Sequence, residues 1–437
     1  MRPPKPLLRQ LAPMIRVAAM FACCALWPAP AGAVFTNGKL QIIHLDAGQG
    51  DGAVIITPGG QVALVDEGTN FTAGSSPPSC SRVLSELQAL GVTHVDLHFA
   101  SHYHADHIGC ITSLTGITID QGWDRGESYT TATYTNYVNY LGGKRHTLTK
   151  GRVFTLDSLS AHPVTITCVA LAGDGITTSD ENSKCLVLKV SYGEFNEVFG
   201  GDLTGYPSGT SSSNTNIETK VGPQVGKVEV YKVHHHGSAY GSYDDWLNAT
   251  QPKVGIVSCG TGNSYGHPTA AALTRLHNHS VRTYWTELGS GTAPNPTWDK
   301  VANDQIKIYA VWQPGGVDSI LAPGIADTLT NSSDGSVTAV TEGPVAPFML
   351  FSPVPNPSHG AVSLRFALAR TGPAQVEVMD IAGRSLWRAD QGLLDAGEHQ
   401  VSWSGYDLNG LDMPTGMYLV RLTSNGVSLT RKLVLLR

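Results

Sequence analysis

Four histidines and an aspartate lie within the thirteen residues HFASHYHADHIGC at 98–110, in a chain of 437 residues that has only 16 histidines. His102 and His104 are two positions apart after a strand-like run, so both side chains point the same way and can bind one metal ion. The chain then turns, and Asp106 and His107 can face a second ion. Imidazole nitrogens and carboxylate oxygens suit zinc, manganese or iron. A polar loop with unrelated histidines is the alternative, and it explains a single histidine better than this cluster.

The segments around the cluster predict many strands and a few helices. Apolar, β-branched runs such as LQIIHL, QVALVD and HVDLHF are cut by glycine-rich turns, which is typical of strands. SCSRVLSELQALG and TAAALTRLHNHS instead carry apolar residues at helical spacing. Many strands with interspersed helices predict two sheets flanked by helices.

The first 33 residues differ from the rest of the chain. They hold four basic residues, no acidic residue, a short apolar run at 17–27 and a small-residue cleavage site, Ala-Gly-Ala, at 31–33. The run is shorter than the roughly 20 residues that a spanning helix needs, which favours cleavage over an N-terminal membrane anchor. We expect residues 1–33 to be a signal peptide, and the mature protein to begin near Val34, to be exported and to contain no membrane span.

The charge of the chain limits its partners. Removing the four positive charges of the signal from a chain of net charge −6 leaves −10. Such acidity does not suit a protein that coats nucleic acid through a broad basic face. An anionic substrate would therefore need a locally positive site, such as one formed by metal ions.

Five cysteines follow the signal, and export permits disulfides. Cys168 and Cys185 lie in two strand-like runs joined by a polar turn region, which makes a cross-strand disulfide between them the first choice. A disulfide between Cys80 and Cys110 is the second choice. Because five is odd, at least one thiol is free or pairs outside the chain.

The composition changes after residue 313. Residues 314–348 are rich in Gly, Ser, Thr and Pro and contain no Lys or Arg. This predicts a linker, with a short strand or two at most. Every candidate ligand precedes residue 268, so we expect a first domain at 34–313 that folds and keeps its metal when the chain is truncated near Gly316.

Residues 349–437 contain about seven short runs of alternating apolar and polar residues with Gly and Asn turns, which predicts a small β-sandwich. VPNPSHG, VMDIAGRSL, WSGYDLNG and MPTGMYLVRL in this part resemble the Ig-like modules of flagellar hook-capping proteins and of secretion-sorting tails. The resemblance implies a module that binds the cell surface or the secretion machinery. A spacer without a partner is the other interpretation.

Six motifs before residue 313 occur in one order. They are LDAGQGDGAVI at 45–55, LVDEG at 64–68, HYHADHIG at 102–109, FGGDL at 199–203, VHHHGS at 233–238 and NSYGHP at 263–268. This series resembles the metallo-hydrolase domain of bacterial competence DNA-uptake channel proteins, which has the metallo-β-lactamase fold. The resemblance covers about residues 38–312. It implies an α/β fold, an αββα sandwich with the site at the carboxyl ends of the strands, followed here by the all-β Ig-like sandwich.

The resemblance also implies a role for each site residue. Two divalent metal ions, zinc first and manganese as the alternative, would be bound by His102, His104, Asp106, His107, Asp202 and His236. Asp202 would bridge the ions. The expected catalytic residues are Asp106, His235 and His267, with His235 contacting substrate or transferring a proton. The residues expected to orient the ligand loops without binding metal are Asp66, Asp46 and Asp51.

Two positions depart from the pattern. Many proteins of this fold carry a further histidine between HxHxDH and the bridging aspartate, whereas only His146 and His162 lie there, in no matching motif. The first metal site would then have fewer protein ligands, or a water in the gap. Cys110 stands where a second glycine is usual.

The expected chemistry follows from the two ions. A water between two cations loses its proton near neutral pH, and the cations hold the oxygens of a tetrahedral transition state. GQGD and HHGS favour, by resemblance, a phosphodiesterase or nuclease, with a small anionic phosphodiester or DNA as substrate. The alternatives are a phosphorylcholine esterase, a lactonase or a β-lactamase on the same fold, and a non-catalytic surface protein with a structural metal site.

Overall fold

The computed structural model describes residues 39–69, 79–206, 216–313, 316–331, 337–342, 348–368, 372–381, 383–394, 397–408, 410–424 and 427–437. The expected signal peptide at 1–33 lies outside the described residues. Within these ranges, no helix combines the length and the apolar composition that crossing a membrane requires.

Two mixed β-sheets make up the first part of the described chain. One has the strand order β18-β17-β16-β15-β1-β2-β3-β4-β5-β6 and the other β14-β13-β12-β11-β10-β9-β8-β7. The strands of the first sheet are β1 (Lys39–His44), β2 (Gly52–Ile56), β3 (Val62–Glu67), β4 (His94–Phe99), β5 (Thr118–Asp124), β6 (Arg145–Thr147), β15 (Ile306–Val311), β16 (Val317–Ala322), β17 (Ile325–Asn331) and β18 (Val337–Glu342). Those of the second are β7 (Val153–Leu156), β8 (Val164–Ala170), β9 (Val187–Tyr192), β10 (Phe195–Phe199), β11 (Val230–Lys232), β12 (Val254–Val257), β13 (Arg282–Trp285) and β14 (Asp299–Val301).

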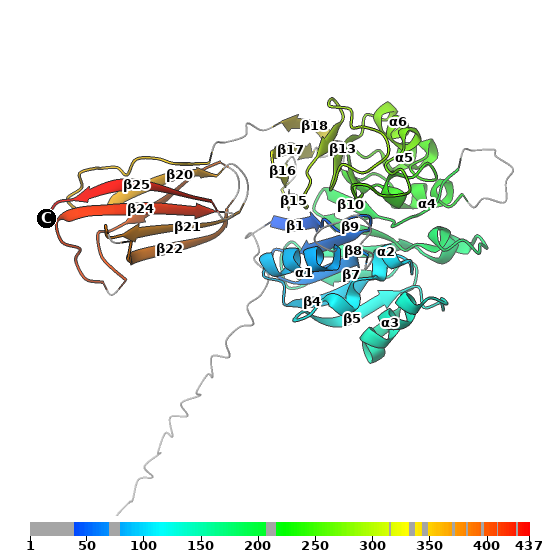
Figure 1. The fold of residues 1–437 in the computed structure, drawn as a ribbon. Helices are drawn as coiled ribbons and strands as arrows, with labels where there is room; N and C mark the ends of the chain where they lie inside the picture. Colours follow the sequence, from blue (N-terminus) through cyan, green and yellow to red (C-terminus); the bar gives the residue numbers. More distant parts are fainter. Residues whose placement is uncertain are drawn as a thin grey trace, which may run out of the picture. The chain divides into compact units, whose positions relative to one another are not determined.

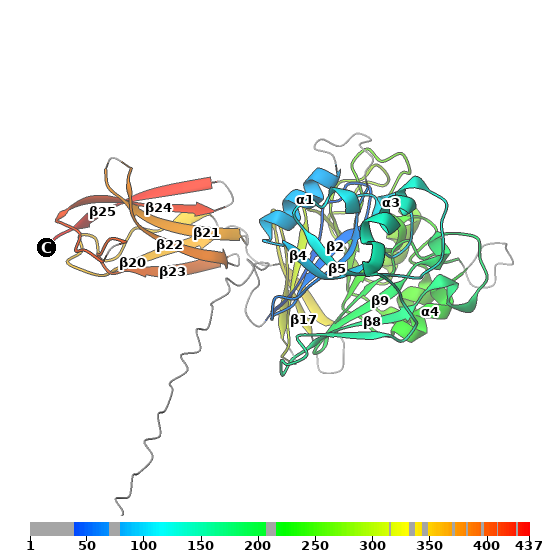
Figure 2. The same ribbon diagram turned by 90° about the horizontal axis from the view of Figure 1, so that it is seen from below.

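Helices lie on the outer face of each sheet (Figures 1 and 2). The α-helices are α1 (Ser79–Ala89), α2 (Ala105–Ile108), α3 (Ala132–Leu141), α4 (Glu218–Val225), α5 (Asp244–Thr250) and α6 (Ala270–Asn278). Short 3₁₀ helices are η1 (Ile111–Ser113), η2 (Gly142–Lys144), η3 (Ala172–Gly175), η4 (Asn182–Lys184) and η5 (His234–Gly237).

The core lies in three layers because side chains alternate between the two faces of a strand. Ile42 of β1 and Ile256 of β12 belong to one buried cluster between the sheets. Ile43, which follows Ile42 in β1, points to the opposite face of the sheet and packs with Val83 and Leu87 of α1. The outer face of the second sheet packs in the same manner against α4, α5 and α6, for example through Trp246. This layering confirms the predicted αββα sandwich.

The expected linker at 314–348 is wrong over most of its length. β16, β17 and β18 pair antiparallel in succession with β15 and extend the first sheet. Ile320 and Leu329 are fully buried in the core between the sheets. The sequence conceals these strands because Asp318 and Asp327 occupy buried positions, where Asp318 accepts a hydrogen bond from the Val311 amide and Asp327 pairs with Lys300.

The C-terminal part forms its own sandwich. A three-stranded sheet of order β19-β20-β23 and a four-stranded sheet of order β22-β21-β24-β25 share one core, in which Phe366 and Val420 are fully buried. The strands are β19 (Met349–Leu350), β20 (Val362–Leu368), β21 (Gly372–Met379), β22 (Ser385–Leu394), β23 (Gly397–Trp403), β24 (Gly416–Ser424) and β25 (Val427–Leu435). This confirms the predicted all-β module.

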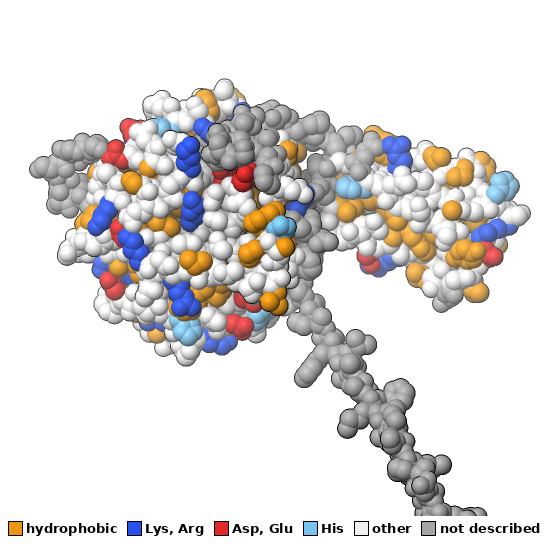
Figure 3. Space-filling model, turned by 180° about the vertical axis from the view of Figure 1, so that it is seen from behind, with side chains coloured by type: hydrophobic (Ala, Val, Ile, Leu, Met, Phe, Trp, Pro, Cys, Tyr) orange, Lys and Arg blue, Asp and Glu red, His pale blue; other side chains and the backbone are white. Residues whose placement is uncertain are grey.

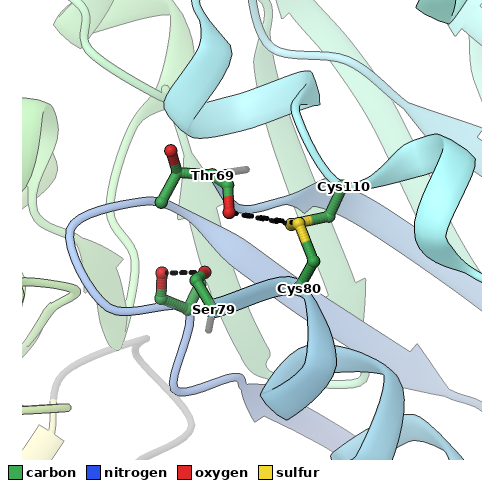
Figure 4. The surroundings of a disulfide bond; sticks show 5 residues. Thr69, Ser79, Cys80 and Cys110 are labelled. Atoms are coloured by element: carbon green, nitrogen blue, oxygen red, sulfur yellow. Dashed lines mark hydrogen bonds between the residues drawn. A yellow bond between two sulfur atoms is a disulfide. The ribbon is translucent and has the colours of Figure 1, made fainter. Parts of the chain in front are cut away.

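One disulfide joins Cys80 of α1 to Cys110, which follows α2 (Figure 4). The Thr69 carbonyl oxygen lies 3.1 Å from the sulfur of Cys80 and 3.0 Å from that of Cys110. The second-choice pairing is therefore confirmed, and the Cys110 that replaces an expected glycine fastens the histidine loop to α1.

The first-choice disulfide between Cys168 and Cys185 is wrong, since both thiols are free and buried. Cys168 pairs across the sheet with Leu188, whereas Cys185 precedes β9. Cys168 belongs to the core between the sheets and Cys185 to the cluster under α4 to α6, so the two thiols lie on opposite faces of the second sheet.

The position of the domain end gives a first prediction. A chain truncated after Gly316 loses Ile320, Ile325 and Leu329 from the core, and each buried side chain of this size contributes about 1.5–3 kcal/mol. We expect this chain to aggregate or to lose on the order of 5 kcal/mol of stability, whereas a chain truncated after Glu342 stays soluble. Soluble yield and denaturant unfolding of the two chains measure the difference. Equal stability of the two truncated chains would support the originally expected domain end at residue 313.

The disulfide gives a second prediction. It closes a loop with a sequence separation of 30 residues, for which chain entropy predicts a contribution of about 3.6 kcal/mol. The double variant Cys80→Ser/Cys110→Ser is expected to unfold at correspondingly lower denaturant concentration. Wild type treated with a reductant is expected to unfold at the same denaturant concentration as the double variant. The reductant is expected to leave the unfolding midpoint of the double variant unchanged. An unchanged midpoint in both cases contradicts a stabilising disulfide.

Candidate metal centre

The predicted site residues come from loops at the carboxyl ends of parallel strands. β3, β4 and β5 run parallel in the first sheet, and β10, β11, β12 and β13 in the second. The HYHADH loop follows β4, Asp202 follows β10, and His235 and His236 lie in η5 just after β11. His267 belongs to the loop between β12 and α6. Strands of one direction thus deliver side chains from distant parts of the sequence to one edge.

Two groups of ligand atoms form at this edge and share Asp202. In the first group, one atom each from Asp106, His107, Asp202 and His236 lie within 4.8 Å of one another. The second group has His102, His104 and Asp202 at the same spacing. All six residues predicted as metal ligands are therefore brought together.

The two oxygens of Asp202 face different groups. Oδ1 lies 3.2 Å from His107 Nε2 and 3.6 Å from His236 Nε2. Oδ2 lies 4.0 Å from His102 Nε2. His102 Nε2 in turn lies 3.0 Å from His104 Nδ1. A carboxylate divided in this way is the arrangement that a bridging ligand between two ions requires.

The polar atoms at the centre fit a metal because they lack other partners. His107 Nε2, His236 Nε2 and Asp202 Oδ1 are buried without a hydrogen bond. A buried polar atom left unpaired costs about 1–3 kcal/mol, and such atoms converge here rather than lying apart. A divalent cation would satisfy all three, so the residues fit the predicted ions.

The Nδ1 atoms of His107 and His236, which point away from the centre, contact other protein groups. His107 Nδ1 lies 2.8 Å from Asp66 Oδ2, and His236 Nδ1 lies 2.9 Å from the Ser258 carbonyl oxygen and 3.2 Å from Asp51 Oδ1. These contacts fix each ring with Nε2 toward the centre, which is how outer partners orient metal-binding histidines. Asp66 and Asp51 also form a third group with His107, but that group uses the hydrogen-bonded nitrogen.

Lys232 is a site residue that the sequence analysis missed. Its buried ammonium lies 2.6 Å from Asp51 Oδ2. Although burial disfavours the charged carboxyl, Lys232 and His236 lower the pKa of Asp51 below its usual range. The lysine that ends β11, two residues before the histidine run, was the available signal, but a lysine there is more often exposed.

Asp46, the third residue expected to orient ligands, lies apart from them. Its carboxylate binds Arg82 and accepts a hydrogen bond from the Gly48 amide. Arg82 also binds Glu287. Asp46 therefore holds the loop after β1 rather than a ligand.

The three consecutive histidines have different surroundings. His234 is buried against Glu218, with 2.5 Å between Nδ1 and Oε1, and has no place in either group. His236 is buried within the first group, whereas His235 keeps 21% of its side chain exposed and lies 3.6 Å from Asp202 Oδ2. His235 and His236 have φ of 52° and 56°. Such left-handed backbone is costly outside glycine and clusters at functional sites.

The charged groups shift each other's pKa. Although burial opposes protonation, Asp202 and Asp51 raise the pKa of His236 to about 10, and Asp202 and Asp66 raise that of His107. Burial, with the neighbouring His107, lowers the pKa of His102. Burial, with His236 and His235, lowers the pKa of His267 to about 4. The two histidines with raised pKa values, His107 and His236, both belong to the first group of candidate ligands.

A pocket of about 680 Å³ opens over the two groups. Its wall includes His104, Asp106, Asp202, His235, His236 and His267. His235 and His267 face each other there, with ring centroids 5.5 Å apart. Both residues expected to act beside the metals therefore border space that a substrate can enter.

Proton competition leads to a third prediction. The raised pKa values of His107 and His236 mean that metal binding releases protons, so affinity rises with pH. We expect zinc affinity to rise about tenfold per pH unit for each proton released, up to about a hundredfold between pH 6 and pH 7. Competition against a chromophoric chelator at each pH measures the zinc affinity. An affinity independent of pH contradicts the proton–metal exchange.

Comparison with known proteins shows similarity in both parts of the chain. The family model of the FlgD Ig-like domain matches residues 356–427. ComE operon protein 3 of Bacillus subtilis is 26% identical over 272 residues, covering 58% of this chain and 32% of that protein. Competence protein ComA of Neisseria gonorrhoeae is 25% identical over 271 residues, covering 61% and 34%. The chain spans about a third of the length of these relatives.

Solved structures align only in part. A diphosphatase of the PhnP family aligns with TM-score 0.34 and 11% identity over 61% of this chain and 96% of that one. FlgD from P. aeruginosa aligns with TM-score 0.16 and 24% identity over 17% of this chain and 61% of that one. The chain is thus similar to metallo-β-lactamase-fold competence proteins and carries a FlgD-like Ig module, as the motifs predicted.

Proposed function

We propose that this chain is an exported hydrolase that uses two divalent ions, zinc first, to activate water for attack on phosphodiesters. The observation that carries the proposal is the divided carboxylate of Asp202, with one oxygen toward each ligand group. The open pocket above it supports catalysis over a purely structural site, which needs no free space beside the ligands.

The ions, when bound, supply an activated water and positive charge for the phosphate oxygens. In the reaction, the water oxygen bonds to phosphorus, the bond from phosphorus to the leaving oxygen breaks, and the leaving oxygen gains a proton. Asp202 would hold both ions, while Asp66 and Asp51 keep His107 and His236 in place. His235 lies at the pocket wall 3.6 Å from Asp202 Oδ2, and in this proposal it exchanges a proton with water or substrate.

His267 is the second candidate for contact with the leaving group. Its lowered pKa of about 4 makes it neutral at pH 7, so it suits hydrogen bonding to substrate more than charge neutralisation. Asn263 holds its backbone amide at 3.1 Å. The position of this histidine is thus fixed by its own loop.

Export is supported by two independent features. The basic and apolar N-terminal segment precedes a small-residue cleavage site. The disulfide between Cys80 and Cys110 suits an oxidising compartment. The FlgD-like module at 356–427 then supports attachment to the cell surface or to secretion machinery.

Substitution of three residues separates their roles and is the fourth prediction. Asp202→Asn is expected to lose one ion and nearly all turnover. His236→Ala is expected to lose metal and rate together. His235→Ala is expected to keep near-full metal content and lose about 10²–10⁴ in rate, the scale of a positioned proton-transfer group.

Metal analysis and turnover of bis(p-nitrophenyl) phosphate, a β-lactam and a lactone give the readouts. His279→Ala is the matched control, because His279 pairs with Asp244 outside the centre. Metal loss in His235→Ala with metal retention in His236→Ala means that ligand and proton-transfer group are exchanged. If only the lactone or the β-lactam is hydrolysed, the proposed metal centre is supported and the proposed phosphodiesterase activity is wrong.

A further inference from the structure

The described wall of the pocket is uncharged apart from the metal centre. None of the described residues that line it is Lys or Arg. The nearby Arg125 is buried and forms two hydrogen bonds with Glu181, each of 2.7 Å. Lys232 is likewise bound to Asp51. Neutralisation of an anionic substrate therefore falls to the metal ions.

Two internal segments of this part of the chain lie outside the described residues, and their composition adds no positive charge. The internal segments outside the described residues in this part of the chain, 70–78 and 207–215, contain no Lys or Arg. On the face shown in Figure 3, Lys and Arg are scattered singly among other side chains. Proteins that follow a nucleic-acid strand use a continuous positively charged groove, and this pocket has no such wall.

Two aromatic rings line the pocket beside the candidate metal centre instead. Tyr129 contacts the candidate ligand His104, with ring centroids 6.0 Å apart. Tyr265 stacks on His267 at 5.7 Å with an interplanar angle of 21°. Tyr265 lines the pocket and is 68% exposed. A large aromatic side chain so exposed leaves one ring face uncovered for a ligand.

The loop that carries Tyr265 is held in place. Asn263 Oδ1 accepts hydrogen bonds from the amides of Tyr265 at 3.2 Å and His267 at 3.1 Å. Asn263 Nδ2 donates to the carbonyl oxygens of Gly260 and His267. Asn263 is 8% exposed. The backbone that carries the aromatic ring is thus held before a substrate arrives, which lowers the ordering cost of binding.

We propose that the substrate is a small phosphodiester bearing an aromatic ring, of the nucleoside class, whose ring stacks on Tyr265 while its single phosphate lies at the metal centre. A polymeric strand is disfavoured, since its further phosphates would meet no Lys or Arg among the described residues of the pocket wall. This inference rests on the proposed phosphodiesterase function and adds the specificity of the same pocket.

The test uses the zinc-loaded full chain and two probes that share a phosphate but differ in the ring, thymidine 5′-monophosphate and glycerol 3-phosphate. Isothermal titration calorimetry measures both dissociation constants in wild type, Tyr265→Ala, Tyr265→Phe and Tyr240→Ala. Tyr240 is the matched control, because it is 55% exposed and is not among the residues lining the pocket. Base stacking on an aromatic residue predicts about a tenfold preference for the nucleotide.

Tyr265→Ala is expected to remove the preference, whereas Tyr265→Phe and Tyr240→Ala are expected to retain it. An unchanged preference in Tyr265→Ala overturns the inference. In a second arm, hydrolysis of a thymidine dinucleotide is compared with that of a 20-residue thymidine strand at 50 and 200 mM salt. A strong advantage of the long strand that falls by about 10³-fold or more with salt also overturns it, because that slope indicates many phosphate contacts.

The two proposals fail separately. If no phosphodiester is hydrolysed while nucleotide binding still depends on Tyr265, the proposed function is wrong and the aromatic recognition stands. If diesters are hydrolysed and Tyr265→Ala changes nothing, the metal chemistry stands and the specificity is wrong.

Discussion

The buried carboxylate of Asp202 is the constraint on which the rest of the site depends. It is 2% exposed, and its two oxygens face separate histidine groups. A buried carboxylate is stable only with compensating charge and hydrogen bonds. Although burial disfavours its charged form, His235 and His107 lower its pKa well below the usual range. The two sheets meet this requirement by ending parallel strands at one edge, so that loops from both sheets surround a single side chain.

Close packing between loops keeps this arrangement in register. The amide of Asp51 donates to the Asp106 carbonyl oxygen at 3.0 Å. A Cβ on Gly50 would lie 2.5 Å from that same oxygen, so the position requires glycine. Asp51 then reaches Lys232 and His236. The GQGD motif therefore connects the HYHADH loop with the histidines after β11, which explains physically why motifs so far apart in sequence belong to one site.

The sequence predicted those parts of the structure in which local pattern and tertiary contact agree. Ligand types, their order and the strand–loop positions of His102 and Asp202 led to the observed groups. Predictions failed where contacts with residues distant in the sequence determine the local structure. Asp318 and Asp327 are typical of loops, yet their buried partners make them strand residues. The Cys168–Cys185 pairing failed because the faces on which two thiols lie depend on strand register. Lys232 was missed because only the fold shows that its ammonium group is buried and paired with Asp51.

The balance of charge in the pocket connects the acidic chain with its proposed chemistry. A phosphate that approaches the metal-free centre meets Asp106 and Asp202 and no cationic Lys or Arg among the described residues of the wall. Two divalent ions would add positive charge that is felt only within a few ångströms, because charges close to the ions dominate in a partly desolvated site. Attraction is then strong for one phosphate and weak for the next along a strand. The remaining binding energy must come from uncharged contacts, and the exposed ring of Tyr265 is the largest of these that the described wall offers.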